Sequence, residues 1–375
     1  MQQRIIIVDF AHMVHTFYHS GFGGSVTVIE NGVPVQKSTR IQYGCIRNIY
    51  NWSAHGNFPT AICFDRPTPA RKQWFSEQFE TMKVGTSKEY KGTREKMPQE
   101  MYEGVLDCER LLTQAGASCF AMPGYEADDL VFASLLCAKK QYPDCPIDII
   151  TNDADLLPLV DEQVSVFIRS KKGTYAVSKE IEKNKYIQVT PANYSEVIEN
   201  LSAYKGFNLP YNTLLLHKLL RGDTSDNING IKRRFCATKF NKMIETFKDW
   251  GVDFENTFRY GVPQTKILYR DTNEEYTGTL EELKNSPDKS KVYQKILNTK
   301  ELDAILDVMS RYTDDDEEVL EHIRKMYWGM NLNQTYPNQQ KDKCRMGIAV
   351  KEIHGFNEFE LQKAVKPLRI NLIRA

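Results

Sequence analysis

Aspartates follow three short apolar runs of the sequence. Asp9, Asp65 and Asp153 each come at the end of a run that is rich in isoleucine, alanine or phenylalanine and long enough for a strand. In an open parallel sheet the carboxyl ends of the strands lie along one edge, so we expect these side chains to converge. Further acids follow predicted strands or stand in short polar motifs, and bring the set to nine: Glu126, Asp128, Asp129, Asp155, Asp223 and Asp226.

Clustered carboxylates repel one another and lose hydration, a cost that bound cations offset. Ligand sets made only of oxygen select hard ions such as Mg²⁺ or Mn²⁺ rather than zinc. Two such ions about 4 Å apart can activate a water, bind a scissile phosphate and stabilise the departing 3′ oxygen. The set therefore predicts hydrolysis of phosphodiester bonds.

Other interpretations of single motifs are weaker. An isolated aspartate is most often a turn or cap residue. The Asp153-Ala154-Asp155 pair alone would also suit a metal-dependent glycosyltransferase. His12, His15 and His19 have helical spacing, but no cysteine or acid nearby completes a tetrahedral zinc set.

Alternating apolar runs and helical patterns in the first 170 residues predict a mostly parallel sheet flanked by helices. We expect helices from near Pro98 to Gly116, over 128–140, and over 194–201. A hairpin over 164–177 should form the edge of the sheet. The predicted strands are 4–8, 60–64, 118–122, 147–150 and 164–168.

The rest of the chain reads differently. Residues 67–96 are polar, basic and rich in aromatic residues, as in a long functional loop. The chain should be largely helical after Leu209, with Thr313 as the N-cap of a helix that runs to about Trp328. Residues 338–345 read as a polar linker, and the segment after them carries no motif that indicates chemistry.

The composition indicates a folded globular protein. The 375 residues are 41% hydrophobic, and 49 basic residues balance 49 acidic ones. The charge is unevenly distributed, with a net charge of +4 over residues 66–96 and of +5 over residues 232–248. Eight scattered cysteines without a CxxC pair predict free thiols in a reducing compartment. The longest apolar run, 130–138, is too short to span a membrane.

Six motifs, in this order, resemble those of the 5′ nuclease superfamily, which includes flap endonucleases, the 5′ nuclease domains of bacterial DNA polymerases, and phage 5′ exonucleases and ribonucleases H. The resemblance covers about residues 4–248 and is closest to divergent phage members. The motifs are Asp9 after the first strand, Phe64-Asp65-Arg66, Tyr90-Lys91-x-x-Arg94, Gly124-Tyr125-Glu126-Ala127-Asp128-Asp129-Leu130, Thr151-Asn152-Asp153-Ala154-Asp155-Leu156, and Gly222-Asp223-x-x-Asp226-Asn227-Ile228-x-Gly230.

The resemblance implies an α/β fold of the PIN-like 5′ nuclease type, with a helical arch and a helix-hairpin-helix-like helical C-terminal region. It also implies two Mg²⁺ ions, for which Mn²⁺ should substitute. One ion would be held by Asp9, Asp65, Glu126 and Asp128, with Asp129 nearby, and the other by Asp153, Asp155, Asp223 and Asp226.

The resemblance also gives the basic residues roles. Lys91 and Arg94 match the catalytic basic pair at the base of the arch, where they would contact the scissile phosphate. The family usually repeats a Gly-Ile-Gly element that holds K⁺, but here Gly230-Ile231 runs straight into basic residues, so phosphate contacts would replace that element. The expected nucleic-acid contacts are Arg66, Arg71, Lys72, Tyr90, Lys232, Arg233, Arg234 and Lys239.

We therefore expect a metal-dependent 5′ to 3′ exonuclease and flap endonuclease that removes primers or flaps during DNA replication. Its substrates would be DNA with 5′ ends or flaps and RNA:DNA hybrids, and its partners would be replication proteins such as a single-strand binding protein or polymerase. We expect a monomer without membrane contact, in the cytoplasm of a bacterial or phage-infected cell. The alternatives are a catalytically silent, structure-specific DNA-binding protein and the glycosyltransferase.

We expect three parts in the chain. Residues 1–205 would form the nuclease core, with the arch at about 66–100. Residues 206–335 would form a helical region that binds duplex DNA, and residues 336–375 a C-terminal linker and tail.

Overall fold

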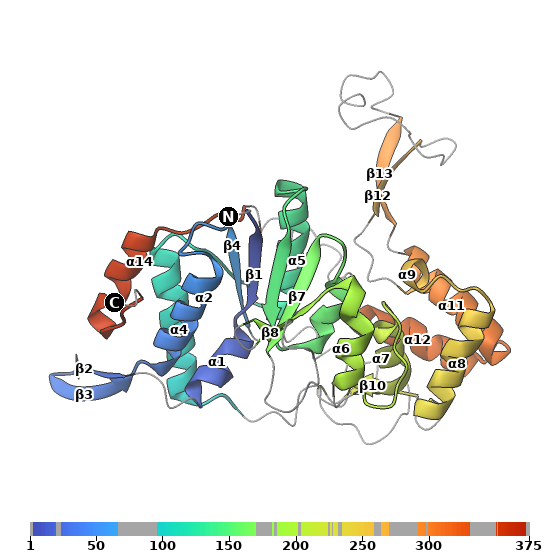
Figure 1. Ribbon diagram of the computed structural model, residues 1–375, viewed down its shortest axis with the longest axis horizontal. Helices are drawn as coiled ribbons and strands as arrows, with labels where there is room; N and C mark the ends of the chain where they lie inside the picture. The colour runs from blue at the N-terminus through green and yellow to red at the C-terminus, as the bar shows by residue number, and fades with distance from the viewer. Residues whose placement is uncertain are drawn as a thin grey trace.

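The computed structural model describes most of the chain, and Figure 1 shows the arrangement of its elements. No helix among the residues that the structure describes is long and apolar enough to cross a membrane. The described residues are 3–19, 24–66, 96–169, 182–183, 186–201, 204–223, 226, 228–231, 235–258, 264–269, 291–297, 299–330, 350 and 352–372.

A seven-stranded sheet with the order β5-β4-β1-β6-β7-β9-β8 forms the centre of the first half of the chain. The first five strands in that order are parallel, and β9 and β8 add an antiparallel edge. This confirms the mostly parallel sheet that the sequence predicts. The strands are β1 (Ile5–Asp9), β4 (Thr60–Phe64), β5 (Ser118–Ala121), β6 (Ile147–Thr151), β7 (Val164–Arg169), β8 (Glu182–Lys183) and β9 (Tyr186–Val189).

Helices cover both faces of this sheet, and β1 shows why. Its residues are all buried, and they alternate between two hydrophobic cores. Ile5 and Ile7 pack with α5 (Ala127–Gln141) on one face. Ile6 and Val8 pack on the other face, as expected for a strand buried on both sides. The helices of that second face are α1 (Ala11–Tyr18), α2 (Arg40–Trp52) and α4 (Gln99–Gln114).

The chain beyond the sheet is largely helical, as the sequence predicts. Helix α7 packs against α12, and its leucines are completely buried. Among the described residues between α7 and α8, two strands of two residues each pair with one another. These elements are α6 (Tyr194–Asn200), α7 (Leu214–Arg221), β10 (Gly222–Asp223), β11 (Ile228–Asn229), α8 (Ala237–Asp249), α9 (Phe254–Thr257), α11 (Thr299–Thr313) and α12 (Glu317–Met330).

Two details of the helical half differ from the predictions. Strands β12 (Gln264–Tyr269) and β13 (Val292–Leu297) pair antiparallel within a region expected to be helical. Thr313 ends α11 instead of capping the next helix, because Asp314 and Asp315 adopt left-handed φ angles of 51° and 58°. Helix α12 then starts at Glu317, and the carboxylate of Asp316 accepts the Glu318 backbone N–H at 3.2 Å.

A hairpin near the N-terminus was also not predicted. Strands β2 (Ser25–Glu30) and β3 (Val33–Ser38) pair around Asn31 and Gly32, whose φ angles are 51° and 81°. An Asn-Gly pair between β-forming residues is the typical sequence of a tight hairpin turn, so the signal was present in the sequence.

The C-terminal segment packs on the edge of the sheet where β4 and β5 begin. The carbonyl of His354 accepts the Thr60 N–H at 3.1 Å, and the carbonyl of Ala115 accepts the Asn357 N–H at 2.9 Å. Helix α14 (Glu358–Val365) then packs against α4, at the left of Figure 1. The tail therefore packs on the sheet-containing half of the chain, across more than 200 residues of sequence.

Replacing Gly355 by alanine should weaken this attachment. A Cβ atom there would lie 2.2 Å from the carbonyl oxygen of Gly56, and backbone cannot move as a side-chain tip can. We expect a loss of about 1–3 kcal/mol of stability, measured by calorimetry or urea unfolding. Gly24→Ala is the control, because its nearest neighbour would be 3.7 Å away. Equal melting temperatures for the two variants would contradict this.

His217 is a buried histidine in the helical half. Its ring packs edge-on against Tyr204, Phe207 and Phe240, with centroids 4.5–5.4 Å apart. Neither ring nitrogen has a hydrogen-bond partner within the described residues. Burial, with nearby Arg221 and Lys218, lowers the pKa of His217 to about 3.

The stability of the fold should therefore fall in acid. Between about pH 6.5 and pH 3 the unfolded chain binds a proton at His217 that the folded chain does not, which costs about 2 kcal/mol by pH 5. In His217→Phe, unfolding free energy measured from pH 7 to 5 should decline less steeply than in the parent. His354→Gln, at an exposed histidine, should keep the parent slope. Parallel curves for His217→Phe and the parent would show that another group controls acid stability.

Candidate active site

Three aspartates lie at the carboxyl ends of adjacent parallel strands. Asp9 ends β1, Asp65 follows β4, and Asp153 comes two residues after β6, and these strands are neighbours in the order β4-β1-β6. The strand order therefore places the three residues at one edge of the sheet. Whether these side chains bind metal stays a prediction.

Donors from the neighbouring elements hold the first carboxylates in place. Oδ2 of Asp9, which is 7% exposed, accepts the Thr151 hydroxyl at 2.7 Å, and its Oδ1 accepts the Ala11 N–H at 3.2 Å. Oδ1 of Asp65 accepts the N–H of Ala127 at 2.8 Å. The start of α5 is thus tied to the end of β4, and the end of β1 is tied to the end of β6 and to the start of α1.

Glu126 and Asp129 form a reciprocal capping box at the start of α5. The Glu126 side chain accepts the backbone N–H of Asp129, and Oδ2 of Asp129 accepts the backbone N–H of Glu126 at 3.0 Å. Both side chains are buried. This arrangement satisfies the first amides of the helix, so the two acids have a structural role whether or not they bind an ion.

Asp153 and Asp155 form a second group. Oδ1 of Asp153 accepts the Asp155 N–H at 2.9 Å, and the Asp153 N–H donates to the Thr151 hydroxyl at 2.9 Å. Part of the Asp153 side chain is exposed to solvent. Desolvation by the surrounding protein atoms, and then the charges of Asp155 and Asp128, raise the pKa of Asp153 well above its ordinary value. Excess negative charge is concentrated here.

Lys218 on α7 supplies a positive charge to this group. It is 5% exposed, and its Nζ donates to Oδ1 of Asp155 and, at 2.8 Å, to Oδ2 of Asp223. Burial alone would lower the pKa of Lys218, but the carboxylates outweigh burial and hold it well above its ordinary value. Lys218 therefore stays charged and links the helical half of the chain to the sheet edge.

Lys218 and Thr151 are not among the site residues predicted from the sequence. The signal for Lys218 was a lysine inside the leucine-rich run 214–220, where a charge is costly unless it is paired. Thr151 stands at the last position of β6 and donates to one aspartate while it accepts from the next.

The other predicted site residues are placed as follows. Arg66 forms a two-pronged ion pair with Glu109 on α4, at 2.8 and 2.5 Å. Asp128 is half-buried in the first turn of α5, and Asp226 is half-buried after β10. Lys239 is exposed in the first turn of α8. The remaining predicted residues lie outside the described ranges: Arg71, Lys72, Tyr90, Lys91, Arg94, Lys232, Arg233 and Arg234.

The three histidines do not form a zinc site. His12 is buried, with Nδ1 against the carbonyl of Asp9 and Nε2 3.3 Å from the Tyr186 hydroxyl. His15 and His19 are exposed. Burial lowers the pKa of His12 to about 4.

Among the residues that the structure describes, no three acidic, histidine or cysteine side chains are arranged to hold a metal ion. The acids instead engage backbone N–H groups, Thr151 and Lys218. Their chemistry nevertheless fits a hard divalent cation, because all donors are oxygen and the second group already accommodates a cationic ammonium. Lys218 thus supplies positive charge to the carboxylates of this second group.

The first half of the chain is similar to known proteins. Residues 4–188 match the family described as 5′-3′ exonuclease, N-terminal resolvase-like domain. The chain is 31% identical to the 5′-3′ exonuclease of Mycoplasma pneumoniae over 200 residues, which are 52% of this chain and 55% of that protein. It is 25% identical to the thermostable DNA polymerase I of Thermus filiformis over 250 residues, 66% of this chain and 24% of that protein.

The chain thus spans about half or less of the length of these curated relatives. Among solved structures, T5 5′-exonuclease with bound zinc covers 98% of this chain and 99% of its own, with a TM-score of 0.49 and 14% identity.

Removing the lysine charge should expose the repulsion among the acids. In EDTA, Lys218→Met should melt several degrees below the parent, because loss of one partner from a buried pair costs about 3–5 kcal/mol. Mg²⁺ or Mn²⁺ should raise its melting temperature more than that of the parent, since the ion replaces the missing charge. Lys139→Met, which breaks the ion pair with Asp161 away from this cluster, is the matched control. Equal metal-induced shifts in both variants would refute this role.

Proposed function

We propose, on the premise that this chain belongs to the 5′ nuclease superfamily through residues 4–188, that it is a metal-dependent 5′ to 3′ exonuclease and flap endonuclease. The observation that carries the proposal is the cluster at the carboxyl edge of the sheet, where Lys218 bridges Asp155 and Asp223 beside Asp153. So much negative charge beside a buried cation is expected where divalent ions and phosphate meet.

Two Mg²⁺ ions, or Mn²⁺ in their place, would supply the charge that activates water and stabilises the scissile phosphate. The residues that would hold one ion are Asp9, Asp65, Glu126 and Asp128, with Asp129 nearby. Those for the other are Asp153, Asp155, Asp223 and Asp226. Lys218 would limit repulsion within this second group while the site contains no metal.

Basic side chains would handle the nucleic acid. Lys91 and Arg94 would contact the scissile phosphate and stabilise its developing charge. Arg66, which follows β4 and pairs with Glu109 on α4, would contact the nucleic acid at the entrance of the arch. Arg71, Lys72 and Tyr90 would contact it as well. Lys232, Arg233, Arg234 and Lys239 would contact the duplex phosphates.

The proposed substrates are DNA with 5′ ends or flaps and RNA:DNA hybrids, which the enzyme would clear as primers or flaps during replication. It would act as a monomer in the cytoplasm of a bacterial or phage-infected cell, beside a polymerase or single-strand binding protein. Residues 1–205, with the arch at 66–100, would perform the chemistry. Residues 206–335 would bind the duplex, and residues 336–375 would form the linker and tail.

Replacing Asp153 by asparagine tests this function. On a labelled 5′-flap duplex and a matched RNA:DNA hybrid, the parent should release products near the 5′ junction with Mg²⁺ and none with EDTA. Asp153→Asn should lower the single-turnover rate at least about a hundredfold, because it removes charge that holds the ions. Its flap affinity should stay within a few fold.

Asp144→Asn is the matched control. Asp144 is exposed just before β6, at the opposite end of that strand, so its loss should not change the rate. Near-parental turnover by Asp153→Asn would refute the ligand assignment. Tight flap binding by the parent without products under any metal would identify a DNA-binding protein that has lost catalysis.

A further inference from the structure

Helix α14 has one side that is largely exposed. Phe359, Gln362, Lys363 and Lys366 have the spacing i, i+3, i+4 and i+7, which places them on one stripe of the helix and its 3₁₀ extension. Phe359 is 71% exposed, although a large aromatic side chain is normally at least partly covered. This stripe therefore faces away from the protein core.

The opposite side of α14 is fixed to the nuclease half. Leu361 and Val365 are completely buried in the same core as α4. The Tyr50 hydroxyl donates to Glu358, and the Asn357 side chain caps the helix by accepting the Glu360 N–H at 3.1 Å. Helix α14 is therefore a rigid support for the exposed stripe.

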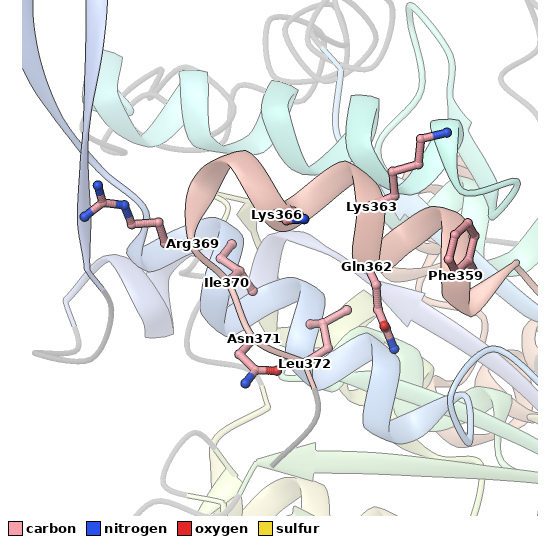
Figure 2. A pocket seen from close by; sticks show the side chains of 8 residues that line it. All are labelled: Phe359, Gln362, Lys363, Lys366, Arg369, Ile370, Asn371 and Leu372. Atoms are coloured by element: carbon pink, nitrogen blue, oxygen red, sulfur yellow. The ribbon is translucent and has the colours of Figure 1, made fainter. Parts of the chain in front are cut away.

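The chain turns back beside the stripe, and the two segments line an open cavity at the surface. Arg369 adopts a left-handed φ of 55°, a conformation usually left to glycine at a helix end. Ile370, Asn371 and Leu372 then run back along the helix, as Figure 2 shows. The cavity between the two segments has a volume of about 500 Å³, and the buried side chains of Ile370 and Leu372 contribute an apolar lining.

The charges at this cavity are positive and only partly compensated. Nζ of Lys363 lies 3.5 Å from Oε2 of Glu360, and both side chains are exposed. Lys366 and Arg369 form no ion pair within the part of the chain that the structure describes. An apolar lining with cationic side chains around it favours a ligand that is apolar at one point and acidic beside it.

We propose that this cavity docks an acidic segment of a partner protein, in which an aromatic or aliphatic side chain enters beside Phe359 and Ile370 while neighbouring carboxylates pair with Lys366 and Arg369. A single anchoring side chain with charged neighbours is how short peptides bind small pockets. Arg369, with its left-handed φ, makes the turn at one end of the cavity and also presents a guanidinium. A glycine could make the turn but would offer no charge.

A protein segment fits this cavity better than a nucleic-acid strand does. Single-stranded nucleic acid binds along grooves that offer successive aromatic platforms. Only Phe359 among the lining residues is aromatic. The lining residues also come from α14 and the segment that follows it, and not from the strands that lead to Asp9, Asp65 and Asp153. The proposal does not depend on the nuclease function.

Fluorescence anisotropy with the full-length chain tests it. The probe is a fluorescein-labelled peptide of six acidic residues followed by Phe-Leu. We expect saturable binding that Lys366→Glu and Arg369→Glu each weaken at least about tenfold, because each reverses a charge beside the peptide. Phe359→Ala should weaken it similarly. A peptide with amides in place of the acids should also bind at least about tenfold more weakly.

Two further variants separate charge from folding. Lys140→Glu makes the same charge change at an exposed position on α5 and should leave binding within twofold. Arg369→Gly removes the charge while easing the backbone, so it should weaken binding although its melting temperature does not fall. Flap cleavage should be unchanged in all of these variants. The proposal is overturned if the peptide does not bind, if Lys140→Glu matches Arg369→Glu, or if an oligothymidylate displaces the peptide.

Discussion

The strand order brings several carboxylates to one edge of the sheet, where they repel one another. The rest of the structure depends on the donors that offset this repulsion. Asp9 and Asp65 are held by backbone N–H groups and by Thr151. Asp155 and Asp223 share the ammonium of Lys218. Each of these donors comes from a different element, so repulsion at the edge is balanced only when the sheet, α5 and α7 are all assembled. The helical half is thereby part of the site and not an appendage to it.

Much of this arrangement could be predicted from the sequence because it follows local rules. Buried parallel strands read as apolar runs, and an aspartate at the end of such a run must lie at the carboxyl edge. The five predicted strands and the helix after Pro98 are confirmed for that reason. The adjacency of β4, β1 and β6 is a property of the topology, which no local rule predicts.

What could not be predicted depends on contacts between distant residues. Lys218 lies 63 positions from Asp155, and in sequence it is one charge in a run of leucines. Thr313 resembles an N-cap, but packing extends α11 through it and Asp314 and Asp315 make the turn instead. The tail offers no motif, yet its backbone pairs with Thr60 and Ala115. The Asn31-Gly32 turn is different, since its local signal was sufficient and was overlooked.

The attachment of the tail would keep the two proposed activities apart on one chain. The acids occupy the carboxyl edge of the sheet, whereas the tail is bonded at the edge where β4 and β5 begin. Helix α14 packs against α4 (Figure 1), and Phe359, Lys363 and Lys366 of its stripe are exposed. A partner bound there would neither cover the acids nor compete with a substrate for them. Because α14 is anchored through Leu361 and Val365, such a partner would nevertheless be held at a fixed position relative to the site.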